Sequence, residues 1–146
     1  MAEADIWPTH AYVPGKTPRH KEGAFDSIRE TAQEGLSPDE LAECAAFRIG
    51  LRYLDAGFYW EAHELFEPVW MVLPDPGHER QFVQGLIQLA NGYLKIRMER
   101  PKAAARLAHI ARALVTDKVH GTVMGVDRRK IAEMIDSLER SLNDEI

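Results

Sequence analysis

A histidine and a glutamate, His63 and Glu67, have the types and spacing best suited to joint chemistry in this sequence. They lie in the stretch FYWEAHELFEPVW, residues 58–70. Residues four apart share one face of a helix, because each residue turns by about 100°. At this spacing, an imidazole nitrogen and a carboxylate oxygen can bind one divalent metal ion. Alternatively, the histidine can act as a base that the glutamate orients.

The face around His63 is predicted to be aromatic. The side chains on it, within about 60° of His63, are Tyr59, Trp60, Phe66, Glu67 and Trp70. Glu61 and Leu65 fall on the far side, and Glu64 lies near the edge. We expect so apolar a face to be buried, and a buried histidine–glutamate pair needs hydrogen-bond partners.

A second polar surface is predicted on the helix of residues 79–99. Its core stripe is Phe82, Leu86, Leu89, Tyr93 and Ile96, and opposite it stand Arg80, Gln84, Gln88, Asn91 and Lys95. A solvated helix face normally carries Glu–Lys pairs, so two glutamines in register favour contact with something polar. A plain solvated face or a helix contact remains the alternative.

The leading hypothesis is a polar pocket between these two helices, centred on His63 and Glu67. Its apolar wall would be Trp60 and Trp70, and its ligand-binding polar wall Arg80, Gln84, Gln88 and Lys95. Arg80 or Lys95 would favour a small anionic ligand. A divalent metal would need a third ligand, for which Gln84, Gln88, His20 or water are the available types. His63-Glu64 begins like the zinc-protease motif His-Glu-x-x-His, but position 67 is glutamate, so no such protease is inferred.

The rival hypothesis is a non-enzymatic interaction module in which His63 and Glu67 are a structural, buried, hydrogen-bonded pair. Residues 1–24 are rich in proline and lack hydrophobic periodicity, which predicts an extended N-terminal arm. Its apolar residues suggest that it covers the helical body or a partner subunit, so a homo-oligomer through the arm is considered. Lys16, Arg19 and His20 make it either an anion-contacting arm or simply a hydrophilic one.

The rest of the chain predicts a single all-α domain over residues 25–146. Ser37-Pro38-Asp39-Glu40 is a helix start with a capping box, and that helix should run to residues 55–57. Gly50 within it suggests a close helix crossing. The helices of residues 58–70, 79–99, 102–115 and 128–143 complete a bundle of about five, built from antiparallel hairpins. Residues 116–126 are predicted to be a loop.

Composition narrows the function classes. The net charge of −5 with mixed signs argues against a nucleic-acid binder. A lone cysteine, Cys44, forms no internal disulfide or thiolate cage, and its neighbours predict a buried, inert thiol. No apolar run approaches the roughly 18 residues of a membrane span, and the N-terminus does not read as a signal peptide. A cytoplasmic protein without membrane contact is expected.

Two segments carry a family resemblance. GFYWEAHELFEPVW (57–70) and ERQFVQGLIQLANGYLKIRMERPKAAARL (79–107) resemble the DUF309 family, small helical proteins of unassigned function. The family pattern His-x-x-x-Glu-x-x-Trp/Tyr is matched by His63, Glu67 and Trp70, and the resemblance spans about residues 49–114. It implies an all-α fold and a metal role for His63 and Glu67. It implies no reaction.

Overall fold

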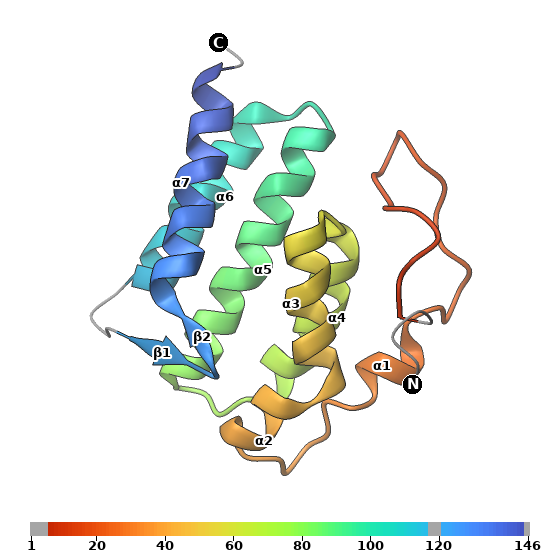
Figure 1. Ribbon diagram of the computed structural model, residues 1–146, viewed down its shortest axis with the longest axis vertical. Coiled ribbons are helices and arrows are strands. Elements are labelled where there is room, and N and C mark those ends of the chain that lie inside the picture. The colour runs from red at the N-terminus through yellow and green to blue at the C-terminus, as the bar shows by residue number, and fades with distance from the viewer. Residues whose placement is uncertain (1–5, 117–120, 145–146) are drawn as a thin grey trace.

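The computed structural model describes residues 6–116 and 121–144, and these residues are mostly helical (Figure 1). The elements found in them are α1 (Asp26–Arg29), α2 (Pro38–Glu43), α3 (Ala45–Ala56), α4 (Tyr59–Val72), α5 (His78–Arg97), α6 (Pro101–Thr116), β1 (Thr122–Val123), β2 (Val126–Asp127) and α7 (Arg128–Asp144). The five long helices α3 to α7 confirm the predicted all-α bundle. No helix in the described ranges combines the length and the apolar character that crossing a bilayer requires.

The helix that starts at Ser37 is shorter than predicted. The capping box is present, since the Ser37 hydroxyl accepts from the Glu40 N–H and the Glu40 carboxylate accepts from the Ser37 N–H. However, Cys44 has an extended backbone and separates α2 from α3. The Ala46 N–H at the start of α3 donates to the hydroxyl of Thr31. This cap comes from outside the helix, so local sequence patterns could not reveal the break. Cys44 is only partly buried.

The predicted loop before α7 contains a small antiparallel hairpin in its described part. Thr122 pairs with Asp127 and Val123 with Val126. The two residues between the strands, Met124 and Gly125, both have positive φ, of 50° and 77°. Such a two-residue turn suits the twist of paired strands. Because each strand has two residues, the segment is too short for an alternating hydrophobic pattern.

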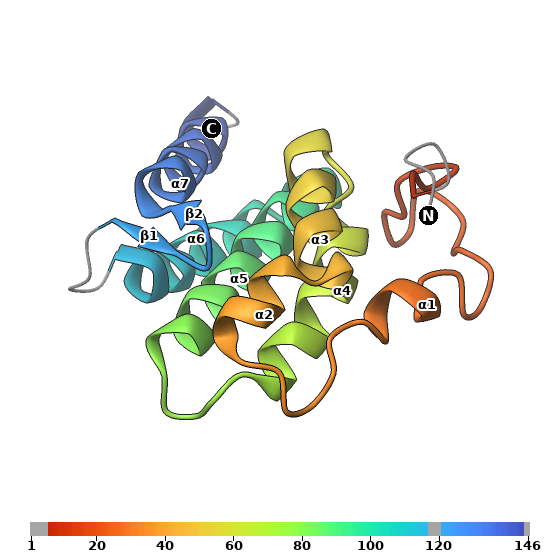
Figure 2. The ribbon, with the colours of Figure 1, turned by 60° about the horizontal axis from the view of Figure 1, so that its bottom comes forward.

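The hairpin of α3 and α4 carries the candidate site. The chain reverses at Gly57, whose left-handed backbone (φ 88°) ends α3. The helices cross closely at Gly50, where a Cβ atom would lie 2.7 Å from the ring of Phe66. The predicted close crossing is therefore confirmed. On its other side α4 packs against α5, which also contacts α6, while α7 packs on α6 (Figures 1 and 2).

The arm, residues 6–25, forms no helix or strand and lies along α3 and α4, on the side of the molecule away from α7 (Figure 2). The Tyr53 hydroxyl donates to the carbonyl of Ile6. The Trp7 ring lies 5.9 Å from those of Tyr53 and Phe58, and Tyr12 packs edge-on against Trp60 at 5.1 Å. The arm thus covers the helices of its own chain. A role in joining subunits stays a prediction.

Candidate functional site

The buried side of α4 is not the side that we predicted. Its buried residues are Glu61, Ala62, Leu65, Phe66 and Val69. The apolar members from position 62 follow the i, i+3, i+4, i+7 spacing of a core-facing stripe. The prediction was wrong because it gave the large aromatic rings more weight than this period. The side chains of His63 and Glu67 are instead partly exposed.

His63 is oriented by its own helix. Its Nδ1 lies 2.9 Å from the backbone carbonyl of Trp60, one turn earlier. A carbonyl can only accept, so Nδ1 carries a proton, and the second ring nitrogen, Nε2, is the one that can offer a lone pair to a metal ion. Nε2 lies 3.5 Å from a carboxylate oxygen of Glu67 and 3.8 Å from one of Glu64. Three electron-rich atoms therefore face one another at this point.

The third member of this group is Glu64, which the sequence placed at the edge of the face. One donor atom from each of His63, Glu64 and Glu67 lies within 4.8 Å of the others. The side chains of His63 and Glu67 are 19% and 43% exposed. The Arg29 guanidinium lies 3.2 Å from a Glu64 carboxylate oxygen and also donates to the Glu64 carbonyl. We call these three residues the His-Glu-Glu cluster.

The predicted pocket is divided, because its two tryptophans line different cavities. Trp70 and Arg80 stack, with the guanidinium carbon 4.3 Å from the ring centre, and with Gln84 they line a cavity of about 230 Å³ beside the turn at Pro76. Trp60 lines a different cavity, of about 430 Å³. Neither of these cavities is lined by His63, Glu67, Gln88 or Lys95. A ligand role for Gln88 and Lys95 stays a prediction.

Sequence reasoning missed a buried carboxylate. Glu61 is fully buried, and one of its oxygens accepts from His20 Nε2 at 2.5 Å and from the Tyr12 N–H at 2.8 Å. Its other oxygen has no hydrogen-bond partner among the described residues. The His20 side chain is 8% exposed, so His20 serves Glu61 and is not the third ligand of the cluster. A carboxylate at position 61, beside the stripe of Ala62, Leu65 and Val69, was the available signal.

The charge of Glu61 is felt at Tyr53. Burial raises the pKa of the Tyr53 hydroxyl to about 12, and the nearby Glu61 carboxylate adds to this effect because it disfavours a second negative charge. The Tyr53 hydroxyl therefore stays protonated and donates a hydrogen bond to the carbonyl of Ile6 in the arm. Glu61 and Tyr53 together bind the arm to α3 and α4 through three separate arm residues, Ile6, Tyr12 and His20.

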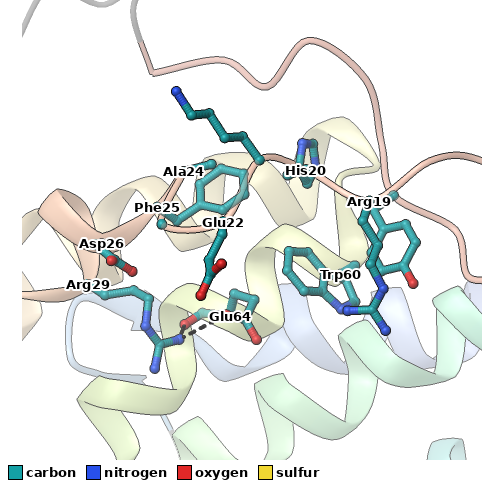
Figure 3. Close-up of a pocket in the computed structure, with 12 residues that line it drawn as sticks. Arg19, His20, Glu22, Ala24, Phe25, Asp26, Arg29, Trp60 and Glu64 are labelled. Carbon is teal, nitrogen blue, oxygen red and sulfur yellow. Dashed lines mark hydrogen bonds and ion pairs between the residues drawn. The ribbon is translucent and has the colours of Figure 1, made fainter.

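The 430 Å³ cavity lies between the arm, α1 and α4 (Figure 3). Tyr12, Phe25 and Trp60 supply aromatic walls, and His20 also lines it. Glu64 belongs both to the lining of this cavity and to the His-Glu-Glu cluster. A molecule in the cavity and an ion at the cluster would therefore share one side chain.

These features define an all-α domain whose central hairpin carries a histidine and two carboxylates beside an arm-covered cavity. Residues 47–107 match the family described as Domain of unknown function (DUF309), which confirms the resemblance that the sequence suggested. The matched segment runs from α3 into α6 and includes the cluster, but not the arm or α7. No curated protein and no solved structure gives a significant match.

Proposed function

We propose that this domain binds a divalent transition-metal ion through His63 Nε2 and the carboxylates of Glu64 and Glu67. The observation that carries the proposal is the orientation of His63. Its Nδ1–H is held by the Trp60 carbonyl, so the lone pair of Nε2 faces two carboxylates. Such a group is repulsive unless a proton or a metal cation lies within it.

The donor set fits such an ion. Atoms bound to one zinc at 2.0–2.2 Å lie about 3.0–3.5 Å apart, and Nε2 and the Glu67 oxygen are already 3.5 Å apart. One imidazole and two carboxylates suit Zn²⁺ and its neighbours better than Mg²⁺ or Ca²⁺. Three protein donors leave coordination positions open, as in catalytic sites. A bound ion would supply Lewis acidity and an acidified water.

Two further residues would affect metal binding at this site. The Trp60 carbonyl fixes the imidazole tautomer, the usual role of a residue behind a metal ligand. Arg29 pairs with Glu64 and so competes with a cation for it. We place this function in the cytoplasm and expect a small, anionic molecule as the further ligand.

The rival function, an interaction module with a structural His63–Glu67 pair, requires that pair to be enclosed. Its partial exposure favours the binding site. The oligomer that the rival implies would be a stable dimer that weakens when residues 1–24 are removed. Size-exclusion chromatography of both chains tests that prediction.

The metal proposal is tested by elemental analysis of protein purified without a nickel column. We expect near-stoichiometric divalent metal in the wild type and none in the His63→Ala/Glu67→Ala variant. His78→Ala/Glu79→Ala is a matched control, because it removes another histidine–glutamate contact, of 3.2 Å, at the start of α5. It should keep the metal. Equal metal content in the wild type and the His63→Ala/Glu67→Ala variant, including none in both after incubation with Zn²⁺ and dialysis, would rule the site out.

A further inference from the structure

The 430 Å³ cavity has the volume of a small-molecule site, and its arm side is held in place at a cost. Among the described residues, the fully buried carboxylate of Glu61 has hydrogen bonds only to two arm residues that line the cavity, Tyr12 and His20. Burying a charge with one oxygen unpartnered among the described residues is unfavourable. Sequences break such local rules mainly at functional sites. Specific buried hydrogen bonds therefore hold the arm residues that form this side of the cavity.

The walls of the cavity are aromatic. Tyr12 and Phe25 are buried, and Trp60 lies within about 6 Å of both, with ring centres 5.1 Å and 6.2 Å away. His20 packs edge-on against Phe25 at 5.0 Å. Flat apolar walls that meet at these angles favour a planar group, because a ring can pack against them face-on or edge-on.

The charged side chains around the cavity balance in sign. They are Arg19, Lys21 and Arg29 on the positive side and Glu22, Asp26 and Glu64 on the negative side. Arg29 pairs with Glu64, whereas Glu22 and Asp26 make no ion pair within the described part of the chain. Figure 3 shows Glu22, Asp26, Glu64 and Arg29 toward one end and Arg19 at the other, beyond the ring of Trp60. Since Arg29 pairs with Glu64, the carboxylates of Glu22 and Asp26 remain at the first end. The cavity is thus negative at one end and positive at the other.

We propose that this cavity binds a small aromatic zwitterion of amino-acid size. Its ammonium group lies toward Glu22 and Asp26, its ring packs on Trp60, and its carboxylate lies toward Arg19. Arg19 is available for this, since it forms no ion pair within residues 6–116 and 121–144 and its guanidinium carbon lies 5.6 Å from the centre of the Tyr12 ring. The proposal does not depend on a metal at the His-Glu-Glu cluster.

Four probes with one ring system test the proposal: L-tryptophan, tryptamine, indole-3-propionate and indole. They carry both charges, the cation only, the anion only, and neither. Isothermal titration calorimetry with the full, metal-stripped chain should give the tightest binding for tryptophan. Loss of either charge should weaken binding about three- to tenfold, the size of one partly exposed ionic contact.

Variants at each end of the cavity sharpen the test. Arg19→Met should weaken tryptophan and indole-3-propionate and leave tryptamine unchanged. Glu22→Gln/Asp26→Asn should weaken tryptophan and tryptamine and leave indole-3-propionate unchanged. Arg106→Met and Glu34→Gln remove exposed charges away from the cavity and should change nothing.

Several outcomes would overturn the proposal. They are no tryptophan binding at millimolar concentration, indole binding as tightly as tryptophan, or Arg19→Met weakening all four probes equally. The His63→Ala/Glu67→Ala variant separates this proposal from the metal proposal. Tryptophan binding that persists in this variant shows that the cavity binds its ligand without the His-Glu-Glu cluster.

Discussion

Helix α4 carries two histidine–carboxylate contacts that share chemistry but differ in surroundings. Glu61 is fully buried and meets His20 at 2.5 Å, across 41 residues of sequence. His63 and Glu67, one turn apart on the helix, meet at 3.5 Å and remain partly exposed. Positions 61 and 63 differ by two residues, which is about 200° around the helix. One pair is therefore turned to the core beneath the arm and the other to the surface.

The difference separates a pair that supports the fold from one that is free to bind. A buried charge that loses its partner is strongly destabilising, whereas an exposed ion pair contributes little to stability. The contact between Glu61 and His20 therefore has a structural role, which is to hold the arm against α4. His63, Glu64 and Glu67 stabilise the chain only weakly, so their donor atoms are available to a ligand.

The largest expected effect is on stability. His20→Ala leaves the buried Glu61 carboxylate without a side-chain partner and with only the Tyr12 N–H among the described residues. We expect it to lower the free energy of unfolding by about 3–5 kcal/mol. His63→Ala removes only a local, partly exposed contact and should cost less than about 1 kcal/mol. Urea unfolding of the metal-free proteins measures both. Equal losses would contradict the assignment of the two pairs.

A matched double variant serves as the control for this prediction. His20→Phe/Glu61→Leu replaces the buried pair by apolar side chains of similar size, and should recover most of the stability lost in His20→Ala. If the double variant is as unstable as the single one, packing rather than the unpaired charge explains the loss.

Much of the fold could be predicted from local patterns. The local signals depend on residues that are close together in the sequence. They are the capping residues at Ser37, the glycine at the α3–α4 crossing and the apolar periods of the long helices. The break at Cys44 could not be predicted, because the hydroxyl that caps α3 belongs to Thr31 in a preceding segment.

The candidate site was predicted in part, for the same reason. The contact between His63 and Glu67 follows from helical spacing alone. The contact between His20 and Glu61 joins an irregular arm to a helix, and no period relates them. The aromatic residues of α4 do not mark its buried side. Trp60 and Trp70 line cavities at the surface, whereas the smaller Ala62, Leu65 and Val69 form the core stripe.

A smaller effect is expected where the two regions meet, at Arg29. Its guanidinium pairs with Glu64 and so withholds one carboxylate from the cluster. Arg29→Met should raise the affinity for Zn²⁺ about three- to tenfold, because a partly exposed ion pair of about 1 kcal/mol no longer competes. Competition with a chelating dye measures the change, with Arg106→Met as the control. An unchanged or lower affinity would mean that Glu64 is not a ligand.

The smallest expected effect is a shift in the ionisation of Tyr53. Its pKa is raised to about 12 from an ordinary 10.0, by burial first and by the charge of Glu61 second. The raised pKa contributes stability that is fully present below about pH 10 and is lost as the pH rises through about 12. Glu61→Gln removes the charge and should lower the pKa of Tyr53, whereas Glu67→Gln should not change it. Ultraviolet titration, with Tyr53→Phe subtracted to isolate this tyrosine, measures both. A similar shift in both variants would mean that the pKa of Tyr53 responds to the net charge of the chain. The buried Glu61 carboxylate would then have no larger effect on Tyr53 than the exposed Glu67 carboxylate has.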